Sequence, residues 1–323
     1  MLRPAAPMAG LRAVRRAAEL ILAGEPVAIP TETVYGLAAD ATNDRAVARI
    51  YEIKGRPSFN PLIIHVADID MARRHVDFSP IAEKLAKAFW PGPLTLVLPR
   101  KAGSGISHLA SAGLDTLAVR APKGVFAQQI IKESGRPLAA PSANRSGSIS
   151  PTTADHVRES LGDRVRLILD GGPCGVGVES TIVKIEGERA VLLRPGGLPR
   201  ADIERVIGAR LETPASAAIE APGMMQSHYA PRARLRLNAA APKEREAFLG
   251  FGAIADEGPA ALNLSEKGDL VEAAANLFSH LRALDAICAE RGLQGIAAAP
   301  IPAFDLGEAI NDRLIRAAAP RKT

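Results

Sequence analysis

The feature that most constrains the fold is an alternation of short apolar runs with capped helical segments along residues 11–208. The apolar runs are brief and bounded by Gly, Pro or capping residues: PVAIP at 26–30, PLIIHV at 61–66, LTLVL at 94–98, TLAVR at 116–120 and PLAAP at 137–141. Runs of this length and composition are typical of buried strands. Strands that alternate with helices predict an α/β domain built on a mixed sheet.

The helical segments of this region are marked by their end signals. Apolar residues at helical spacing predict a helix over 11–22 that stops at Gly24. Asn43 or Asp44 is expected to cap a second helix, which ends at the Gly and Pro that follow Lys54. The remaining expected elements are a helix opened by Ser79–Pro80, helices at 125–134, from Thr152 or Thr153 to 161 and at 201–208, a strand at 166–170 and a hairpin over 180–194.

Beyond about residue 200 the character of the sequence changes. Residues 212–226 are rich in Pro, Ala and Gly and show no period, which is typical of a linker. After this stretch we expect strands at 234–238, 248–254 and 296–302 and helices at 269–291 and 306–319. The sequence therefore predicts a catalytic domain over 1–208, a linker or lid over 209–232 and a small α/β domain over 233–323.

The charge of the chain favours basic residues dispersed over the surface more than a nucleic-acid-binding face. The formal net charge is +5 and the pI about 9.4, but no dense basic run is present. The two cysteines lie far apart, which argues against a disulfide framework or a zinc site. The first residues lack the apolar core of a signal peptide, and no apolar stretch has the length of a membrane span. We therefore expect a soluble cytoplasmic protein that makes no membrane contact.

The familiar nucleotide-binding and hydrolase motifs are missing from the sequence. It contains no GxxxxGK[ST] loop, no GxGxxG after a strand, and no HExxH or GxSxG. A nucleotide site in this chain must therefore be built in another way.

The pair Lys54 and Arg56 is the first candidate for such a site. Both cations flank a glycine at an expected helix end and precede Pro57. Helix C-termini favour cations, so a solvated surface pair is one interpretation. A polyphosphate needs a similar arrangement, namely a point charge and a bidentate fork on constrained backbone. On these residues alone both interpretations stay open.

Small polar groups also follow several expected strand ends. AAPSANRSGSIS at 139–150 and PTETVYG at 30–36 each follow a strand, and VEST at 178–181 opens the hairpin. Ligands in α/β sheets sit beyond the carboxyl ends of strands, so these groups are candidates for binding, although ordinary turns and helix caps use the same residues. His65, Arg120 and Arg194 lie on or at the ends of strands. Taken alone, a histidine on an apolar strand is more often a core residue than a functional one, and an arginine at a strand end is about as often a surface charge as a ligand clamp.

The combination and order of these motifs resemble one family. PTETVYGL, KGR with NPLIIH after it, WPGPLT, GLDTLAVR, APSAN, VEST and LLRPG together resemble the YrdC-like threonylcarbamoyl-AMP synthases. SHYAP at 227–231 and the segment GEAINDRL resemble the longer, two-domain form of that family. The resemblance covers nearly the whole chain in family order.

This resemblance implies a fold and an activity. The fold would be a twisted mixed-sheet domain with a concave basic cavity, plus a smaller Rossmann-like C-terminal α/β domain. The activity would be synthesis of L-threonylcarbamoyl-AMP from L-threonine, bicarbonate or CO₂ and ATP, with release of pyrophosphate, for threonylcarbamoyladenosine modification of tRNA. Implied partners are the downstream tRNA threonylcarbamoyl-transfer machinery and a possible tRNA contact. Mg²⁺ is expected with ATP, carried by the phosphates, with no metal ligands on the protein.

The resemblance also implies the residues of the site. Lys54 and Arg56 would be catalytic because they offset charge on the phosphates, and Arg120 would bind the carboxylate of threonine. The ATP-binding residues implied are Lys54, Arg56, Asn60, Thr116, Ser142, Asn144, Ser150, Arg194 and Tyr229. The L-threonine-binding residues implied are Thr31, Thr33, His65, Arg120 and Ser180.

Two other functions compete with the synthase. A basic cavity could hold double-stranded RNA or tRNA without catalysis, although the chain is only 4% aromatic and has no basic stripe. A paralogous hydrolase on the same fold is the second alternative, because fold alone does not determine function. Salt-sensitive RNA binding without threonine-dependent ATP turnover would indicate the first of these.

Overall fold

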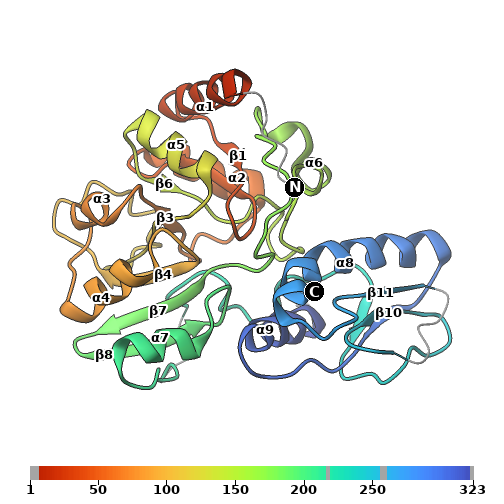
Figure 1. The fold of residues 1–323 in the computed structure, drawn as a ribbon. Helices are drawn as coiled ribbons and strands as arrows, with labels where there is room; N and C mark the ends of the chain where they lie inside the picture. The colour runs from red at the N-terminus through yellow and green to blue at the C-terminus, as the bar shows by residue number, and fades with distance from the viewer. Residues whose placement is uncertain (1–6, 216–218, 255–259, 321–323) are drawn as a thin grey trace.

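The computed structural model of the chain describes residues 7–215, 219–254 and 260–320. Within them the strands form two separate sheets, one of eight strands and one of four (Figure 1). We refer to residues 7–208 as the N-terminal unit, to 209–232 as the connecting segment and to 233–320 as the C-terminal unit. The blue C-terminal unit lies beside the hairpin and loops of the N-terminal unit (Figure 1).

The large sheet is mixed, as the sequence predicted. Its strand order is β1-β2-β6-β3-β5-β4-β7-β8, in which β3–β5 and β4–β7 pair in parallel and the other neighbours are antiparallel. The strands are β1 Val27–Ile29, β2 Gly36–Asp40, β3 Ile63–His65, β4 Leu94–Pro99, β5 Thr116–Arg120, β6 Leu138–Ala139, β7 Thr181–Glu186 and β8 Arg189–Arg194. The parallel register sets His65 opposite Arg120, so the ends of β3 and β5 meet at one edge of the sheet.

The helices of this unit begin and end at the residues that cap them. The Asn43 side chain accepts the backbone N–H groups of Arg45 and Ala46, and Gly55 ends that helix in the left-handed region with a φ of 58°. Thr153, not Thr152, caps the helix near the sheet edge. The helices are α1 Pro7–Leu22, α2 Asp44–Lys54, α3 Ile69–Arg73, α4 Pro80–Phe89, α5 Val125–Ser134, α6 Ala154–Leu161 and α7 Arg200–Ile207, with a 3₁₀ turn η1 at Gly162–Arg164.

Four strands expected from the sequence differ in the structure. Those expected at 234–238 and 296–302 end earlier, at Arg236 and Ala298. Residues 166–170 make only a single parallel bridge, between Ile168 and Ala28. In it the Ala28 N–H donates to the carbonyl of Leu167, and the Leu169 N–H donates to the carbonyl of Ala28. The strand expected at 248–254 begins earlier and ends at Gly250. It stops there because Gly252 has a φ of 73°, which is incompatible with extended backbone.

The C-terminal unit is an all-parallel four-stranded sheet of order β11-β10-β12-β9 with two helices. Its elements are β9 Arg234–Arg236, β10 Glu246–Gly250, β11 Ala261–Asn263, α8 Leu270–Arg291, β12 Gly295–Ala298 and α9 Leu306–Ala318. Leu277, Phe278 and Leu281 on α8 are fully buried. Each such side chain contributes about 1.5–3 kcal/mol on burial, so one face of α8 anchors this core.

The two units are packed tightly against each other. A Cβ placed on Gly177 would lie 2.3 Å from the carbonyl oxygen of Ala274 on α8, so the two backbones touch there. Thr152 Oγ1 lies 2.9 Å from Ser279 Oγ, and the guanidinium of Arg282 donates to the carbonyl of Ile149. Helix α8 therefore docks on the loops that precede α6 and β7.

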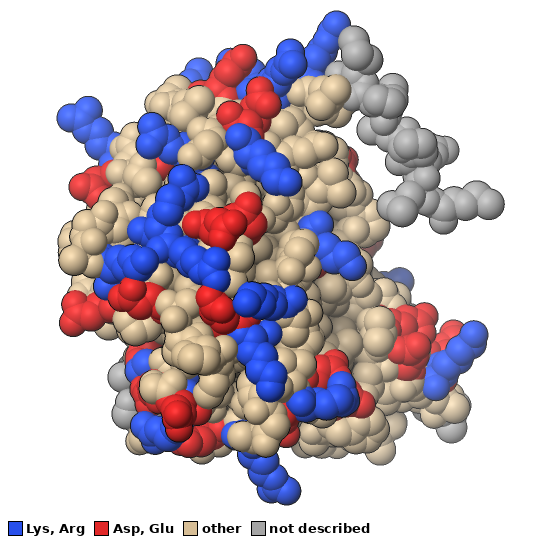
Figure 2. Space-filling model, turned by 60° about the vertical axis from the view of Figure 1, so that its left-hand side comes forward, with Lys and Arg blue, Asp and Glu red and all other residues tan. Residues whose placement is uncertain are grey.

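Basic and acidic side chains alternate over the face of the protein drawn in Figure 2, where Lys and Arg lie beside Asp and Glu. Among the surface ion pairs, Arg73 pairs with Asp70 and Glu83, and Glu83 also pairs with Lys87. Among the described residues, none of the helices combines the length and apolarity that a bilayer crossing requires.

Candidate active site

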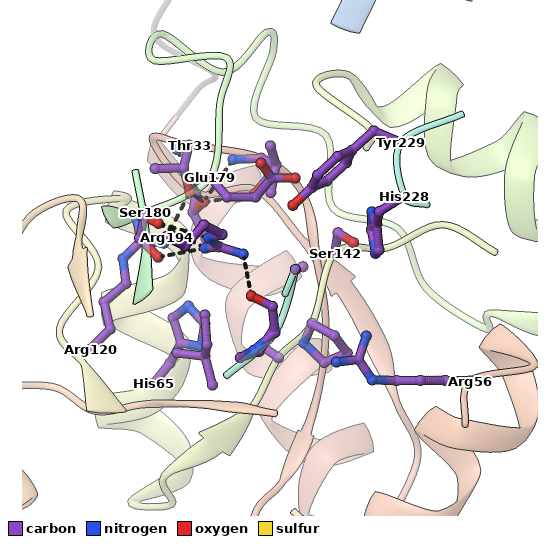
Figure 3. A pocket seen from close by; sticks show the side chains of 18 residues that line it. Thr33, Arg56, His65, Arg120, Ser142, Glu179, Ser180, Arg194, His228 and Tyr229 are labelled. Carbon is purple, nitrogen blue, oxygen red and sulfur yellow. Dashed lines mark hydrogen bonds between the residues drawn. The ribbon is translucent and has the colours of Figure 1, made fainter. Parts of the chain in front are cut away.

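A cavity opens beyond the ends of the central strands of the large sheet. It encloses about 540 Å³, including the solvent at its mouth. Figure 3 shows arginine, hydroxyl and imidazole groups from several elements around it. Its polar lining consists of Thr31, Thr33, Arg56, His65, Arg120, Ser142, Glu179, Ser180, Arg194, His228 and Tyr229. The structure thus brings together nine of the residues that the sequence singled out, with Glu179 and His228 in addition.

The two cations at the end of α2 differ in their position relative to the cavity: one lines it and the other lies behind its wall. Arg56 lines the cavity, and its Nε and Nη2 donate to the carbonyls of Asn60 (3.1 Å) and Pro61 (2.8 Å). Lys54 lies behind the cavity wall, where its Nζ donates to the carbonyls of Ser142 (2.7 Å) and Asn144 (2.6 Å). Burial and the neighbouring Arg56 hold the pKa of Lys54 well below its usual value. The two hydrogen bonds from Lys54 Nζ order the turn that carries Ser142.

The turn after β6 is fixed by its own side chains. Ser142 Oγ donates to Asn144 Oδ1 at 2.6 Å, and Asn144 Nδ2 donates to the carbonyl of Ser148 at 2.8 Å. A bridge between Gly36 and Ser142 holds this turn against the start of β2. As a result, Ser142 lines the cavity while Asn144 is buried behind it.

Arg120 at the end of β5 is held by the loop that follows β1. Its Nη2 donates to Glu32 Oε1 at 2.6 Å and its Nη1 to Thr33 Oγ1 at 3.0 Å, while its Nε donates to the carbonyl of Gly92. Burial raises the pKa of Glu32, but the charge and hydrogen bond of Arg120 outweigh it and the net pKa is lowered. Three of the five guanidinium N–H groups are used, so two remain for a ligand.

His65 stands beside Arg120 as a neutral group. Burial, and then the positive charge of Arg120, lower the pKa of His65 to about 3. Its Nδ1 is buried and has no hydrogen-bond partner among the described residues. At neutral pH the cavity wall therefore offers an uncharged imidazole next to a guanidinium.

Arg194 at the end of β8 folds back onto the start of β7. Its Nη2 donates to the carbonyl of Ser180 at 2.8 Å and lies 3.2 Å from Ser180 Oγ, which in turn contacts Thr95 Oγ1 at 2.7 Å. Its Nη1 donates to the carbonyl of Pro222 at 3.2 Å. Since Pro222 belongs to the connecting segment, this segment occupies one donor of a cavity arginine.

The connecting segment also places two aromatic rings at the cavity. His228 and Tyr229 point into it in Figure 3, and their ring centroids are 4.0 Å apart. Tyr229 stacks on Phe278 of α8 at 5.6 Å, and its hydroxyl has no hydrogen-bond partner among the described residues. Within 209–215 and 219–232 the segment forms no helix or strand, apart from a bridge between Glu212 and Val191.

Glu179 is a cavity residue that the sequence reasoning missed. Its Oε1 accepts Ser150 Oγ at 2.5 Å, and its Oε2 accepts Nε of Arg313, a residue of α9, at 2.8 Å. Burial raises the pKa of Glu179, but Arg313 and Arg194 outweigh it and bring the pKa down to about 2. The carboxylate is therefore ionised. The sequence did offer one signal for this residue, because Glu179 lies inside the VEST motif at 178–181, which was a candidate for ligand binding.

Five of the predicted site residues do not line the cavity. Lys54, Asn144 and Ser150 lie one contact behind its wall, and Asn60 accepts from Arg56 and approaches Met225. Thr116 is paired with Pro99 at the end of β5 opposite to Arg120. Along the strand, Thr116 and Arg120 are about 13 Å apart. The structure does not bring Thr116 to the cavity, and its expected contact with ATP stays a prediction.

Comparison with known proteins places the chain in a family. The family model for Sua5, YciO and YrdC proteins, described as "Telomere recombination", matches residues 19–196. A model described as "Threonylcarbamoyl-AMP synthase, C-terminal domain" matches residues 198–319. The threonylcarbamoyl-AMP synthase of Bacillus subtilis is 42% identical over 95% of this chain and 93% of its own length. That of Pyrococcus abyssi is also 42% identical, over 95% of this chain and 94% of its own.

A solved structure agrees with this assignment. The crystal structure of Pyrococcus abyssi Sua5 complexed with L-threonine superposes with a TM-score of 0.86 at 40% identity and covers 94% of both chains. The fold and the cavity define an α/β enzyme of the Sua5, YciO and YrdC class. The chain belongs to the threonylcarbamoyl-AMP synthase family, in the form that carries the additional C-terminal domain. The α/β mixed-sheet fold class and the enzymatic activity expected from the sequence are thereby confirmed, while the concave basic cavity, the domain boundaries and the residue roles stay predictions.

Proposed function

We propose that this cavity joins L-threonine, bicarbonate or CO₂ and ATP into L-threonylcarbamoyl-AMP and pyrophosphate, the precursor for modification of adenosine in tRNA. The observation that carries the proposal is the convergence of three buried guanidinium groups, Arg56, Arg120 and Arg194, with serine and threonine hydroxyls around one cavity. Such groups bind carboxylates and phosphates through charge-assisted hydrogen bonds. The names of the relatives and the threonine complex of one of them support this choice of substrates.

The end of the cavity around Arg120 suits threonine. The two remaining N–H groups of Arg120 can donate to its carboxylate, and Thr31, Thr33 and Ser180 supply hydroxyls for its polar groups. Neutral His65 adds an imidazole nitrogen without a repelling charge for the amine. Together these groups form the proposed threonine subsite.

The end around Arg56, Ser142 and Arg194 suits the triphosphate. Lys54 and Asn144 would act from behind the wall by holding the turn that presents Ser142. Asn60, Ser150 and Tyr229 complete the proposed ATP contacts at this end, and a contact of ATP with Thr116 stays a prediction that this cavity does not support. Among the described residues, no group of three or more His, Cys, Asp or Glu side chains is arranged to hold a metal ion. Glu32 and Glu179 are each paired with an arginine, so Mg²⁺ would enter with the phosphates.

The reaction needs no nucleophilic side chain. The threonine amine forms an N–C bond with bicarbonate, giving a carbamate and water, or with CO₂, giving a carbamate and a proton that passes to solvent. A carbamate oxygen then attacks the α-phosphorus of ATP, and pyrophosphate leaves. Positioning the three reactants and neutralising the charge that develops on the leaving pyrophosphate supply the catalysis, and Arg56 and Arg194 are placed for the second task.

Threonine-dependent pyrophosphate release tests the proposal directly. Purified protein is incubated with Mg²⁺-ATP, with and without L-threonine and bicarbonate, and pyrophosphate and adenylate products are quantified. We expect turnover that requires both co-substrates. Turnover indifferent to threonine would indicate the paralogous hydrolase, and a folded protein without turnover that binds RNA would indicate the binding module.

Replacing Arg120 with lysine is expected to weaken threonine binding selectively. Lysine keeps the charge but loses the planar fork that Glu32 and Thr33 orient. The loss of charge-assisted hydrogen bonds to a carboxylate costs about 1.5–3 kcal/mol, so the KM for threonine should rise roughly 10- to 100-fold. Steady-state kinetics with each substrate varied in turn checks this. A KM for ATP that rises as much as that for threonine would contradict the assignment.

Loosening the connecting segment is expected to uncouple ATP hydrolysis from synthesis. Replacement of residues 219–227 by Gly and Ser, at equal length, removes the Met225 side chain that contacts Asn60. It also loosens the backbone whose Pro222 carbonyl accepts from Arg194. Water then reaches the carbamate and the adenylate, so ATP consumed per product formed should rise at least about fivefold. Glu220→Gln is the control, because Glu220 pairs with Lys184 outside the cavity. If the ratio of ATP consumed to product formed stays unchanged, the connecting segment does not protect the intermediates from water.

A further inference from the structure

Helix α9 inserts an arginine from the C-terminal unit between the two units. Arg313 is completely buried, and its Nε donates to Glu179 Oε2 at 2.8 Å. Its Nη1 donates to the carbonyl of Pro195 at 2.9 Å and to Asp312 Oδ2 at 2.6 Å. Its guanidinium carbon lies 5.2 Å from the centre of the Tyr229 ring. A single side chain of the C-terminal unit therefore touches a cavity carboxylate, the strand end after Arg194 and the connecting segment.

The carboxylate that Arg313 contacts is placed where its charge matters. Glu179 lines the cavity and holds Ser150, and it directly precedes Ser180, which Arg194 binds. An ionised carboxylate at this place repels a polyanion such as a triphosphate, and in a buried setting that repulsion is weakly screened. The guanidinium of Arg313, which pairs with Glu179, offsets this repulsion. Arg194 binds Ser180 and the carbonyl of Pro222 instead of the Glu179 carboxylate.

We propose that Arg313 is a positioning residue of the nucleotide site: it neutralises and orients Glu179, so that ATP binds well only when the C-terminal unit is docked. This inference rests on the function proposed above and deepens it. It gives the C-terminal unit a role in substrate binding that its own fold, without a phosphate loop, does not provide. Arg313 acts through Glu179 and makes no step of the chemistry itself.

Another ion pair on the same helix shows what an ordinary link between the units looks like. Arg200 on α7 pairs with Glu308 on α9 at 2.6 Å, but both side chains are about 30% exposed and neither lines the cavity. Exposed ion pairs of this kind contribute little to the free energy of folding. The Arg313–Glu179 pair is 0% and 9% exposed, so removing one partner leaves an uncompensated buried charge. The two pairs therefore make a matched set for testing.

The experiment compares Arg313→Gln, the double variant Glu179→Gln with Arg313→Gln, and the control Glu308→Gln. Rates of threonine-dependent pyrophosphate release are measured with ATP varied at saturating threonine and bicarbonate. We expect Arg313→Gln to raise the KM for ATP by at least about 100-fold. The double variant should return to within about tenfold of the unmodified enzyme, because the uncompensated charge is gone while Gln still accepts Ser150. Glu308→Gln should stay within about twofold.

The rescue separates a charge effect from a loss of fold. Thermal unfolding of every variant is recorded, and the double variant stays informative where Arg313→Gln is too unstable to assay. A KM for ATP in Arg313→Gln close to that of Glu308→Gln would overturn the inference, as would a double variant no better than the single one. If the unmodified protein shows no threonine-dependent turnover, the proposed function fails. In that case, calorimetric titration of ATP into the same variants measures their dissociation constants for ATP and so still tests whether Arg313 supports ATP binding.

Discussion

Replacing Lys54 with methionine is expected to lower kcat/KM for threonylcarbamoyl-AMP formation by roughly a thousandfold. Its Nζ donates to the buried carbonyls of Ser142 and Asn144, at 2.7 and 2.6 Å. Methionine fills similar space but, among the described residues, leaves the Asn144 carbonyl without a donor and the Ser142 carbonyl with only the backbone N–H of Asn144. The loss of a donor to a buried carbonyl costs about 1–3 kcal/mol. The turn then relaxes and takes the Ser142 hydroxyl out of place. The effect should appear mainly in the rate of pyrophosphate release and little in the far-ultraviolet circular dichroism.

A second lysine of the chain supplies the control for this prediction. Lys101 also donates its ammonium to a backbone carbonyl, that of Arg73, at 2.7 Å, but it lies away from the cavity. Lys101→Met should therefore keep kcat/KM within about twofold. A Lys54→Met variant that retains a tenth or more of the activity would mean that the turn holds its shape without the ammonium.

Substituting alanine for Gly177 is expected to undock the C-terminal unit. The residue has a φ of 77°, and an added Cβ would lie 2.3 Å from the carbonyl oxygen of Ala274 and 2.4 Å from Cα of Ala275. Both atoms are helix backbone, so α8 must move away by about 1 Å or more to restore van der Waals contact. The movement breaks the contacts around Arg313, and kcat/KM for ATP should fall at least about 100-fold. Small-angle X-ray scattering should show a larger radius of gyration.

The control for undocking has the same backbone strain without the clash. Gly187 in the turn between β7 and β8 has a φ of 63°, and nothing lies within 4 Å of an added Cβ. Gly187→Ala should cost about 1 kcal/mol of stability through its backbone conformation and leave turnover and scattering unchanged. If both alanine variants behave alike, strain and not the lost contact with α8 explains the effect.

The helices were predictable because their ends carry local chemistry. Asn43 and Gly135 occupy the cap positions that the sequence indicated, and α5 spans Val125–Ser134 as expected. Strand β2 was missed because all of GLAAD is buried and its small residues show no alternation. Helix α3 was missed because its five residues are too few to display a helical period. Strand β11 was missed because its three residues are only partly buried.

The cavity was predictable to the extent that its residues sit in recognisable motifs. Ser142 and Arg56 were found in this way, but their neighbours Asn144 and Lys54 face the protein interior, and no sequence pattern distinguishes a wall residue from the one behind it. The Glu179–Arg313 pair joins residues 134 positions apart on different units. Only the packing of α9 on the N-terminal unit brings these charges together, so local sequence carries no signal of it.

The bond from Arg194 to the carbonyl of Pro222 has a consequence for how nucleotide affinity should be understood. The chain itself acts as a tethered competitor for one donor of the site, and a tether of this length supplies an effective concentration of roughly millimolar order. The dissociation constant measured for ATP is then the intrinsic constant divided by the fraction of molecules whose segment has released Arg194. Sequence changes in the connecting segment can therefore tune the enzyme to the ATP level of its cell without altering any residue that ATP touches.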